Sequence, residues 1–113
     1  KDPTTSVIEG TFTDDERADA LAGPVPAEDR FAARFAAKEA FIKAIGGARI
    51  DQPPVLDRLA HRDIEVVKDA WGRPSIELHG TALILSNEFG VTRTWLSMSH
   101  DEGHAIAMVV LEK

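Results

Sequence analysis

The chain has 113 residues, enough for one domain with its own hydrophobic core. It has no cysteine, which excludes disulfides and thiolate chemistry. Its net charge of −6 argues against nucleic-acid binding, which needs a dominant basic surface. No apolar run approaches the roughly 18 residues of a membrane span, and no secretory signal is visible. We therefore expect one domain over residues 1–113, in the cytoplasm, with no nucleic-acid or membrane partner.

Two helices are predicted in the first half of the chain. Thr13 and Glu16 have the spacing of a capping box, which predicts a short helix over 14–21 that ends before Gly23. Pro26 suits the first turn of a second, longer helix, because its fixed φ and missing N–H are tolerated there. The glycine pair at 46–47 is expected to close this helix.

The long helix carries cations within its apolar arc. At 100° per residue, Arg34 and Lys38 fall among its large apolar side chains, namely Phe31, Phe35, Phe41, Ile42 and Ile45. An unpaired buried charge is costly, so these cations either face anions or a ligand, or reach water past the apolar surface. Glu39 and Lys43 lie one turn apart at the edge of the arc, where a plain ion pair is the simple alternative. Because residues 30–49 are basic, the first alternative predicts a pocket for an anion.

The second half of the chain is predicted to be mostly strands. After a loop over 46–60 come strands at 63–67 and 75–78, with a turn at 71–74. A short helix over 81–89 and two strands, 92–99 and 104–111, complete the chain. Helices followed by antiparallel strands predict an α+β domain. Both faces of the last two strands are apolar, which predicts an oligomer that covers the second face.

Single motifs in this half give little chemistry. Residues 99–101 read Ser-His-Asp, but neighbouring strand residues point to opposite faces, so they cannot form a catalytic triad. His100 and His104 flank a tight turn, yet two histidines without a third ligand do not predict a metal site. Trp71 and Trp95 are interpreted as anchors in a core or an interface.

Three segments taken in order are more informative. The segments 34–44 (RFAAKEAFIKA), 71–74 (WGRP) and 97–101 (SMSHD) closely resemble the holo-acyl-carrier-protein synthases, which are small 4′-phosphopantetheinyl transferases. The family shows an Arg-Phe-Ala-x-Lys-Glu-Ala-x-x-Lys-Ala helix, a Gly-Lys-Pro turn and a Ser-x-(Ser/Thr)-His-(Asp/Glu) strand end. The resemblance runs from about Phe12 to the C-terminus, and residues 61–74 resemble actinobacterial members. It implies a mostly antiparallel sheet packed against one long helix and shorter helices.

The resemblance also implies an activity and its first site residues. The family transfers 4′-phosphopantetheine from coenzyme A to a serine of apo acyl carrier protein, with magnesium, and releases 3′,5′-ADP. The reaction belongs to fatty-acid biosynthesis and lipid metabolism. Its small members are homotrimers with each site between two subunits. Glu39 and Lys43 would then be the catalytic residues: Glu39 as the metal ligand and as a base or water-positioning group, and Lys43 as a clamp on the pyrophosphate. Arg34 and Lys38 would support the phosphate-rich site.

The nucleotide end of coenzyme A is implied to meet the other two segments. Gly72 and Pro74 would form a close, rigid wall beside it. Arg73 stands where the family usually has Lys. Ser99 and His100 would meet the adenosine and its 3′-phosphate.

One departure from the family concerns the metal. The family opens with a strand of the form Gly-x-Asp-x-x, whose Asp binds magnesium together with the helix Glu. Asp2 is not in that context, so we expect a chain that is incomplete at its N-terminus. Three alternatives therefore remain: a coenzyme A-binding trimer without activity, a transferase domain excised from a fatty-acid synthase, and a purely structural α+β domain.

Overall fold

The predicted elements are present in the predicted order, and their ends shift by no more than a few residues. The computed structural model describes residues 10–22, 27–47, 59–101 and 103–113. The helices are α2 (Asp14–Leu21), α3 (Ala27–Gly47), the 3₁₀ turn η2 (His61–Asp63) and α4 (Gly80–Glu88). The strands are β1 (Ile64–Lys68), β2 (Pro74–Leu78), β3 (Arg93–Asp101) and β4 (His104–Glu112). The segment before residue 10 and most of the loop predicted over 46–60 lie outside the described residues.

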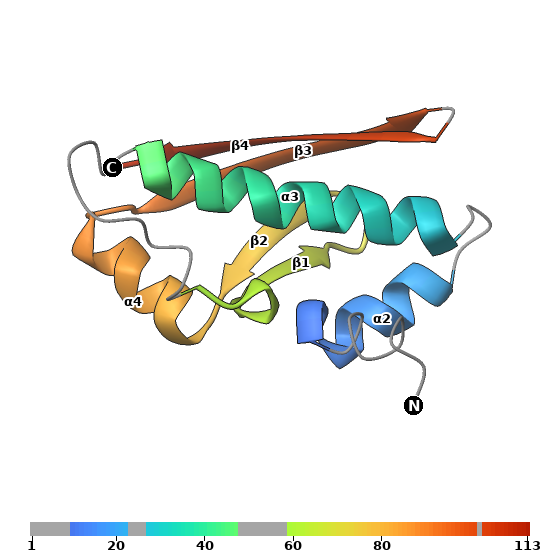
Figure 1. Ribbon diagram of the computed structural model, residues 1–113, viewed down its shortest axis with the longest axis horizontal. Helices are drawn as coiled ribbons and strands as arrows, with labels where there is room; N and C mark the ends of the chain where they lie inside the picture. The colour runs from blue at the N-terminus through green and yellow to red at the C-terminus, as the bar shows by residue number, and fades with distance from the viewer. Residues whose placement is uncertain (1–9, 23–26, 48–58, 102) are drawn as a thin grey trace.

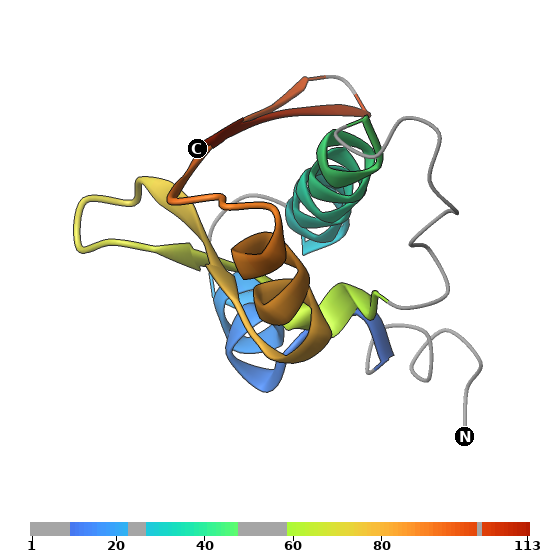
Figure 2. The same ribbon diagram turned by 90° about the vertical axis from the view of Figure 1, so that its left-hand side faces the viewer.

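The long helix α3 lies at the centre of the fold. The strands pair antiparallel as two hairpins, β1 with β2 and β3 with β4. Figure 1 shows β3 and β4 running along one side of α3, with β1, β2 and α4 on its other side. Figure 2 looks along α3 and shows the β1–β2 hairpin projecting away from the body. The core lies between these elements and contains Phe41, Ile42, Ile45, Leu59, Ile64, Ala82 and Leu85.

Helix α2 explains why α3 tolerates buried cations. The α2 capping box is present, with Glu16 N–H donating to the Thr13 hydroxyl and Thr13 N–H donating to Glu16. Glu16 is buried and accepts a 2.8 Å hydrogen bond from Lys38 Nζ. One turn earlier on α3, Arg34 donates to Asp19. The partners of both cations are therefore carboxylates of this chain, and the alternative in which their heads reach water is wrong.

Two large aromatic side chains, Trp71 and Phe35, lie at the surface. Trp71 is 82% exposed at the tip of the β1–β2 hairpin, so it is not a core residue. Phe35 is 44% exposed and stacks on the ring of His61 at 5.4 Å between centroids. Among the described residues, the buried stripe of α3 is therefore narrower than the predicted apolar arc.

The β3–β4 hairpin keeps one apolar face uncovered. Side chains alternate along both strands, and cross-strand pairs such as Trp95 with Val110 lie on the exposed face. The exposed large apolar side chains there are Trp95, Ile106, Met108 and Val110. This confirms that both faces of the hairpin are apolar. Within the described ranges, no helix is long and apolar enough to cross a bilayer.

Candidate active site

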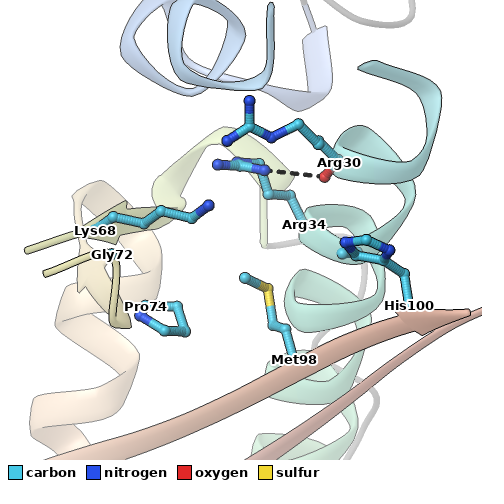
Figure 3. Close-up of a pocket in the computed structure, with 8 residues that line it drawn as sticks. Arg30, Arg34, Lys68, Gly72, Pro74, Met98 and His100 are labelled. Carbon is cyan, nitrogen blue, oxygen red and sulfur yellow. Dashed lines mark hydrogen bonds between the residues drawn. The ribbon is translucent and has the colours of Figure 1, made fainter. Parts of the chain in front are cut away.

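A cavity of about 180 Å³ opens between α3, the β1–β2 turn and β3. Its walls come from parts of the chain that are far apart in sequence, namely Arg30, Ala33, Arg34, Lys68, Gly72, Pro74, Met98 and His100. Figure 3 shows the guanidinium groups of Arg30 and Arg34 side by side, with the Lys68 amine directed toward them. Met98 and His100 approach from β3, since residues two apart on a strand share a face.

The charged side chains that line the cavity, Arg30, Arg34 and Lys68, are all basic. Burial, followed by the neighbouring charge of Arg34, lowers the pKa of Lys68, and Arg30 adds to this while Asp19 opposes it. Arg34 Nη2 donates a hydrogen bond to Asp19, and Arg34 Nη1 donates to the Arg30 carbonyl oxygen at 3.1 Å. Arg34 Nε and Arg30 Nη1 are buried and find no hydrogen-bond acceptor among the described residues. Buried donors of this kind are rarely left unpaired, so the cavity suits an anionic ligand with several acceptor oxygens.

The turn between β1 and β2 is held rigidly at the mouth of this cavity. One carboxylate oxygen of Asp69 accepts from the backbone N–H groups of Trp71 and Arg73, at 2.8 and 2.9 Å. The other accepts from Arg73 Nε at 3.0 Å, and these bonds lower the pKa of Asp69. Gly72 has φ of +80°, which a side chain would disfavour. The turn is therefore pre-shaped, with Gly72 and Pro74 facing the cavity and Arg73 turned to Asp69.

Glu39 forms a second cluster, on the opposite side of α3. It lies nine residues after Arg30, which is half a rotation away on the helix. Its carboxylate pairs with His61 Nε2 at 2.7 Å, rather than with Lys43. The Glu39 side chain remains 39% exposed, so a ligand can approach it. Lys43 is exposed one turn further along.

Lys38 lies between the two clusters and is fully buried. Its ammonium donates to Glu16, to the His61 carbonyl at 2.9 Å and to the Ile64 carbonyl at 2.6 Å. Burial is the largest cause of its lowered pKa, which the Glu16 hydrogen bond and charge only partly oppose. All three donors are thus used within the protein. Lys38 fastens η2 and the start of β1 to α3, which positions His61 beside Glu39.

The structure gathers part of the residue set expected from the sequence. Arg34, Gly72, Pro74 and His100 line the cavity. Glu39, Lys43, Lys38, Arg73 and Ser99 lie outside it. Ser99 is on the exposed face of β3 with Trp95, because strand neighbours point to opposite sides.

The sequence did not identify four of the lining residues, namely Arg30, Ala33, Lys68 and Met98. Arg30 is one turn before Arg34, so helical spacing could have pointed to it. Met98 shares a strand face with His100, and the same alternation could have pointed to it. Lys68 reaches the cavity only through the strand pairing that sets the hairpin, and nothing in its local sequence indicates this.

Of the groups near these clusters, Glu39 fits a magnesium ion. Magnesium prefers carboxylate oxygen and is usually held by one or two carboxylates, substrate phosphates and water. The partly exposed carboxylate of Glu39 meets that requirement, and the hydrogen bond with His61 fixes its orientation. Among the described residues, Glu39 is the carboxylate that this cluster offers, so oxygen atoms from phosphate and water would complete the coordination.

Comparisons with known proteins agree with this geometry. A family model described as the 4′-phosphopantetheinyl transferase superfamily matches residues 1–109. The chain is 42% identical over 108 residues to a holo-[acyl-carrier-protein] synthase of Geobacter sulfurreducens, covering 95% of this chain and 79% of the relative. It is 42% identical to one of Mycobacterium tuberculosis, covering 98% and 83%. The solved Chronobacterium ammoniagenes ACPS–CoA complex superposes with a TM-score of 0.84 at 36% identity, covering 99% of this chain and 84% of that chain.

Proposed function

This chain belongs to the 4′-phosphopantetheinyl transferase superfamily, and from that premise we propose that it transfers 4′-phosphopantetheine from coenzyme A to a serine of apo acyl carrier protein. The serine oxygen forms a bond to the β-phosphorus, and the bond from that phosphorus to the bridging pyrophosphate oxygen breaks. The serine proton passes to a base, and 3′,5′-ADP leaves with the bonding electron pair. Such transfers depend on positioning and charge neutralisation more than on covalent catalysis.

The cationic cavity is the observation that carries this proposal. Arg30, Arg34, Lys68 and His100 line one cavity, and Arg34 Nε and Arg30 Nη1 are buried without a hydrogen-bond partner among the described residues. The nucleotide end of coenzyme A carries a 3′-phosphate, whose oxygens would accept those bonds. Gly72 leaves room for close approach of the backbone.

The remaining residues divide between direct and supporting roles. Lys43 is exposed and free to clamp the pyrophosphate. Arg73 is exposed on the turn beside the cavity and would contact the nucleotide from its rim. Ser99 lies on the opposite face of β3 from Met98 and His100, so within one chain it would not reach a nucleotide in this cavity. Lys38 supports the site from within, since its ammonium holds η2 against α3.

Glu39 is proposed to hold magnesium, which when bound neutralises charge on the transferred phosphate. Glu39→Gln keeps the shape and the possible hydrogen bond to His61 but removes the negative charge. We expect it to abolish transfer and to weaken binding of Mn²⁺, used as a magnetic probe for magnesium, by tenfold or more. Activity within about threefold of the parent would remove Glu39 from this role.

The two clusters are proposed to meet between subunits of a homotrimer. Glu39 and the cavity lie on opposite sides of α3, so one chain does not bring them together. The exposed face of Trp95, Met108 and Val110 offers an apolar surface for the contact. Sedimentation equilibrium at micromolar concentration should give a trimer. A monomer that still binds coenzyme A would contradict both the assembly and the shared site.

Ligand pairs test the two ends of the site separately. His100→Ala should weaken the binding of coenzyme A about tenfold more than the binding of dephospho-coenzyme A, because only coenzyme A carries the 3′-phosphate. Lys43→Ala should weaken the binding of both ligands equally, because both carry the pyrophosphate. Calorimetry measures the four affinities against the parent. Equal losses for both ligands in the His100 variant would remove His100 from the 3′-phosphate.

The proposal places the enzyme in the cytoplasm, where coenzyme A and acyl carrier protein are available. The alternatives of an inactive coenzyme A-binding trimer and of an excised fatty-acid synthase domain gain no support from the comparisons. The chain covers 79% and 83% of the two holo-[acyl-carrier-protein] synthases described above.

A further inference from the structure

Three side chains with metal-binding chemistry meet on one face of the β1–β2 hairpin. Glu65 of β1 is the direct cross-strand partner of Glu77 of β2. His79 follows two residues after Glu77 and precedes the first turn of α4, so the strand alternation directs it to the same side. One carboxylate oxygen from each glutamate and one ring nitrogen of His79 lie within 4.8 Å of one another.

Glu65 is prepared as an ionised ligand. It is buried, and its Oε2 accepts a 2.7 Å hydrogen bond from the Thr13 hydroxyl. Its Oε1 lies 2.8 Å from His79 Nε2. Burial alone would raise the pKa of Glu65, but the hydrogen bonds from Thr13 and His79 and the charge of His79 lower it overall. The carboxylate is therefore fixed in place and negatively charged.

Glu77 makes the cluster unfavourable without a cation. It is exposed and makes no ion pair with any described side chain. It nevertheless lies directly across the ladder from the ionised Glu65, and facing like charges destabilise a sheet. A protonated His79 neutralises only one of the two carboxylates. A bound divalent cation would neutralise both, which is why the arrangement points to a ligand and not only to an ion pair.

We propose that Glu65, Glu77 and His79 bind a divalent transition-metal ion of the Zn²⁺ class, at a site separate from Glu39. Imidazole nitrogen favours Zn²⁺ over Mg²⁺, which prefers oxygen ligands alone. Ligand atoms on one zinc ion lie about 3 to 4 Å apart, so a small rotation of the exposed Glu77 side chain closes the cluster. Three protein ligands leave a coordination position for water.

The proposed zinc site connects several elements of the fold. Its ligands join β1, β2 and the start of α4, and the Thr13 bond continues to the start of α2. The same hairpin carries Gly72 and Pro74 at the wall of the cationic cavity. Zinc would therefore stiffen the base of the hairpin whose tip shapes that cavity.

Calorimetry with Zn²⁺ on the full chain tests the proposal. We expect one Zn²⁺ per chain, with binding at least tenfold weaker in Glu77→Gln and in His79→Gln. His104→Gln removes another exposed histidine, and Glu39→Gln removes the carboxylate of the separate cluster; both should bind Zn²⁺ like the parent. Excess Mg²⁺ should not compete.

Thermal unfolding supplies the second readout. Zn²⁺ at a hundredfold excess over its dissociation constant should raise the Tm of the parent and leave that of Glu77→Gln unchanged. Glu77 is exposed, so this variant is expected to fold. Unchanged Zn²⁺ affinity in Glu77→Gln, or loss of binding in His104→Gln or Glu39→Gln instead, would overturn the proposal.

Discussion

Replacing Lys38 by methionine should be among the most damaging single substitutions in this chain. Methionine keeps the length and volume of the stem, so the change removes the ammonium and little packing. Three short hydrogen bonds are lost, to Glu16 at 2.8 Å, to the His61 carbonyl at 2.9 Å and to the Ile64 carbonyl at 2.6 Å. The Glu16 carboxylate, which is 1% exposed, then stays buried without its counter-charge.

The expected loss follows from these contacts. Hydrogen bonds to charged groups contribute about 1.5 to 3 kcal/mol each, but removing Lys38 also removes the cost of burying its charge. Breaking one side of a buried pair therefore costs about 3 to 5 kcal/mol, a large share of the roughly 5 to 15 kcal/mol that stabilises a domain. Urea denaturation followed by circular dichroism measures the free energy of unfolding.

A matched control and a cycle make the test specific. Lys43→Met changes an exposed lysine of the same helix and should alter stability by no more than about 0.5 kcal/mol. Glu16→Gln should cost less in the Lys38→Met background than in the parent, by a coupling of about 0.5 to 3 kcal/mol. A loss below about 1 kcal/mol for Lys38→Met would refute the assignment of Lys38 as the buried link between α2 and α3.

Two further predictions concern stability. The lowered pKa values of Lys38 and Lys68 mean that the unfolded chain binds more protons in the alkaline range below 10.5, so stability should rise with pH there. The chain has no Tyr or Cys to obscure the effect. Denaturation curves at several pH values give the free energy of unfolding at each pH, and this free energy should rise less steeply with pH in Lys68→Met than in the parent. Gly80→Ala should cost about 1 to 3 kcal/mol of stability, because φ is +52° and the new Cβ would lie 2.8 Å from Asp63 Oδ2. Gly46→Ala, with open space around the new Cβ, should be neutral or stabilising. Equal effects of the two glycine variants on the free energy of unfolding would contradict this.

Local sequence patterns predicted the elements well, because each one has a local physical cause. The Thr13 capping box starts α2, and alternating side chains define the long β3 and β4 strands. Gly72 at positive φ marks the turn between β1 and β2. None of these features depends on the rest of the fold.

The partners of the charged residues could not be predicted in this way. Helical spacing placed Lys38 in the apolar arc but could not show that Glu16, 22 residues earlier, would meet it there. Lys68 reaches the cationic cavity through strand pairing, and Glu39 faces away from that cavity because nine residues turn the helix by half a rotation. Such long-range contacts follow from tertiary packing, which no local pattern contains.

Transfer of the phosphopantetheinyl group is the most direct test of the proposed activity. The chain is incubated with coenzyme A, magnesium and an apo acyl carrier protein, and the carrier is analysed by mass spectrometry. We expect a carrier heavier by one 4′-phosphopantetheinyl group on its serine, with 3′,5′-ADP as the second product. The gain should disappear in the Glu39→Gln variant and when a chelator removes magnesium. A folded chain that binds coenzyme A but leaves the mass of the carrier unchanged would contradict the proposed activity.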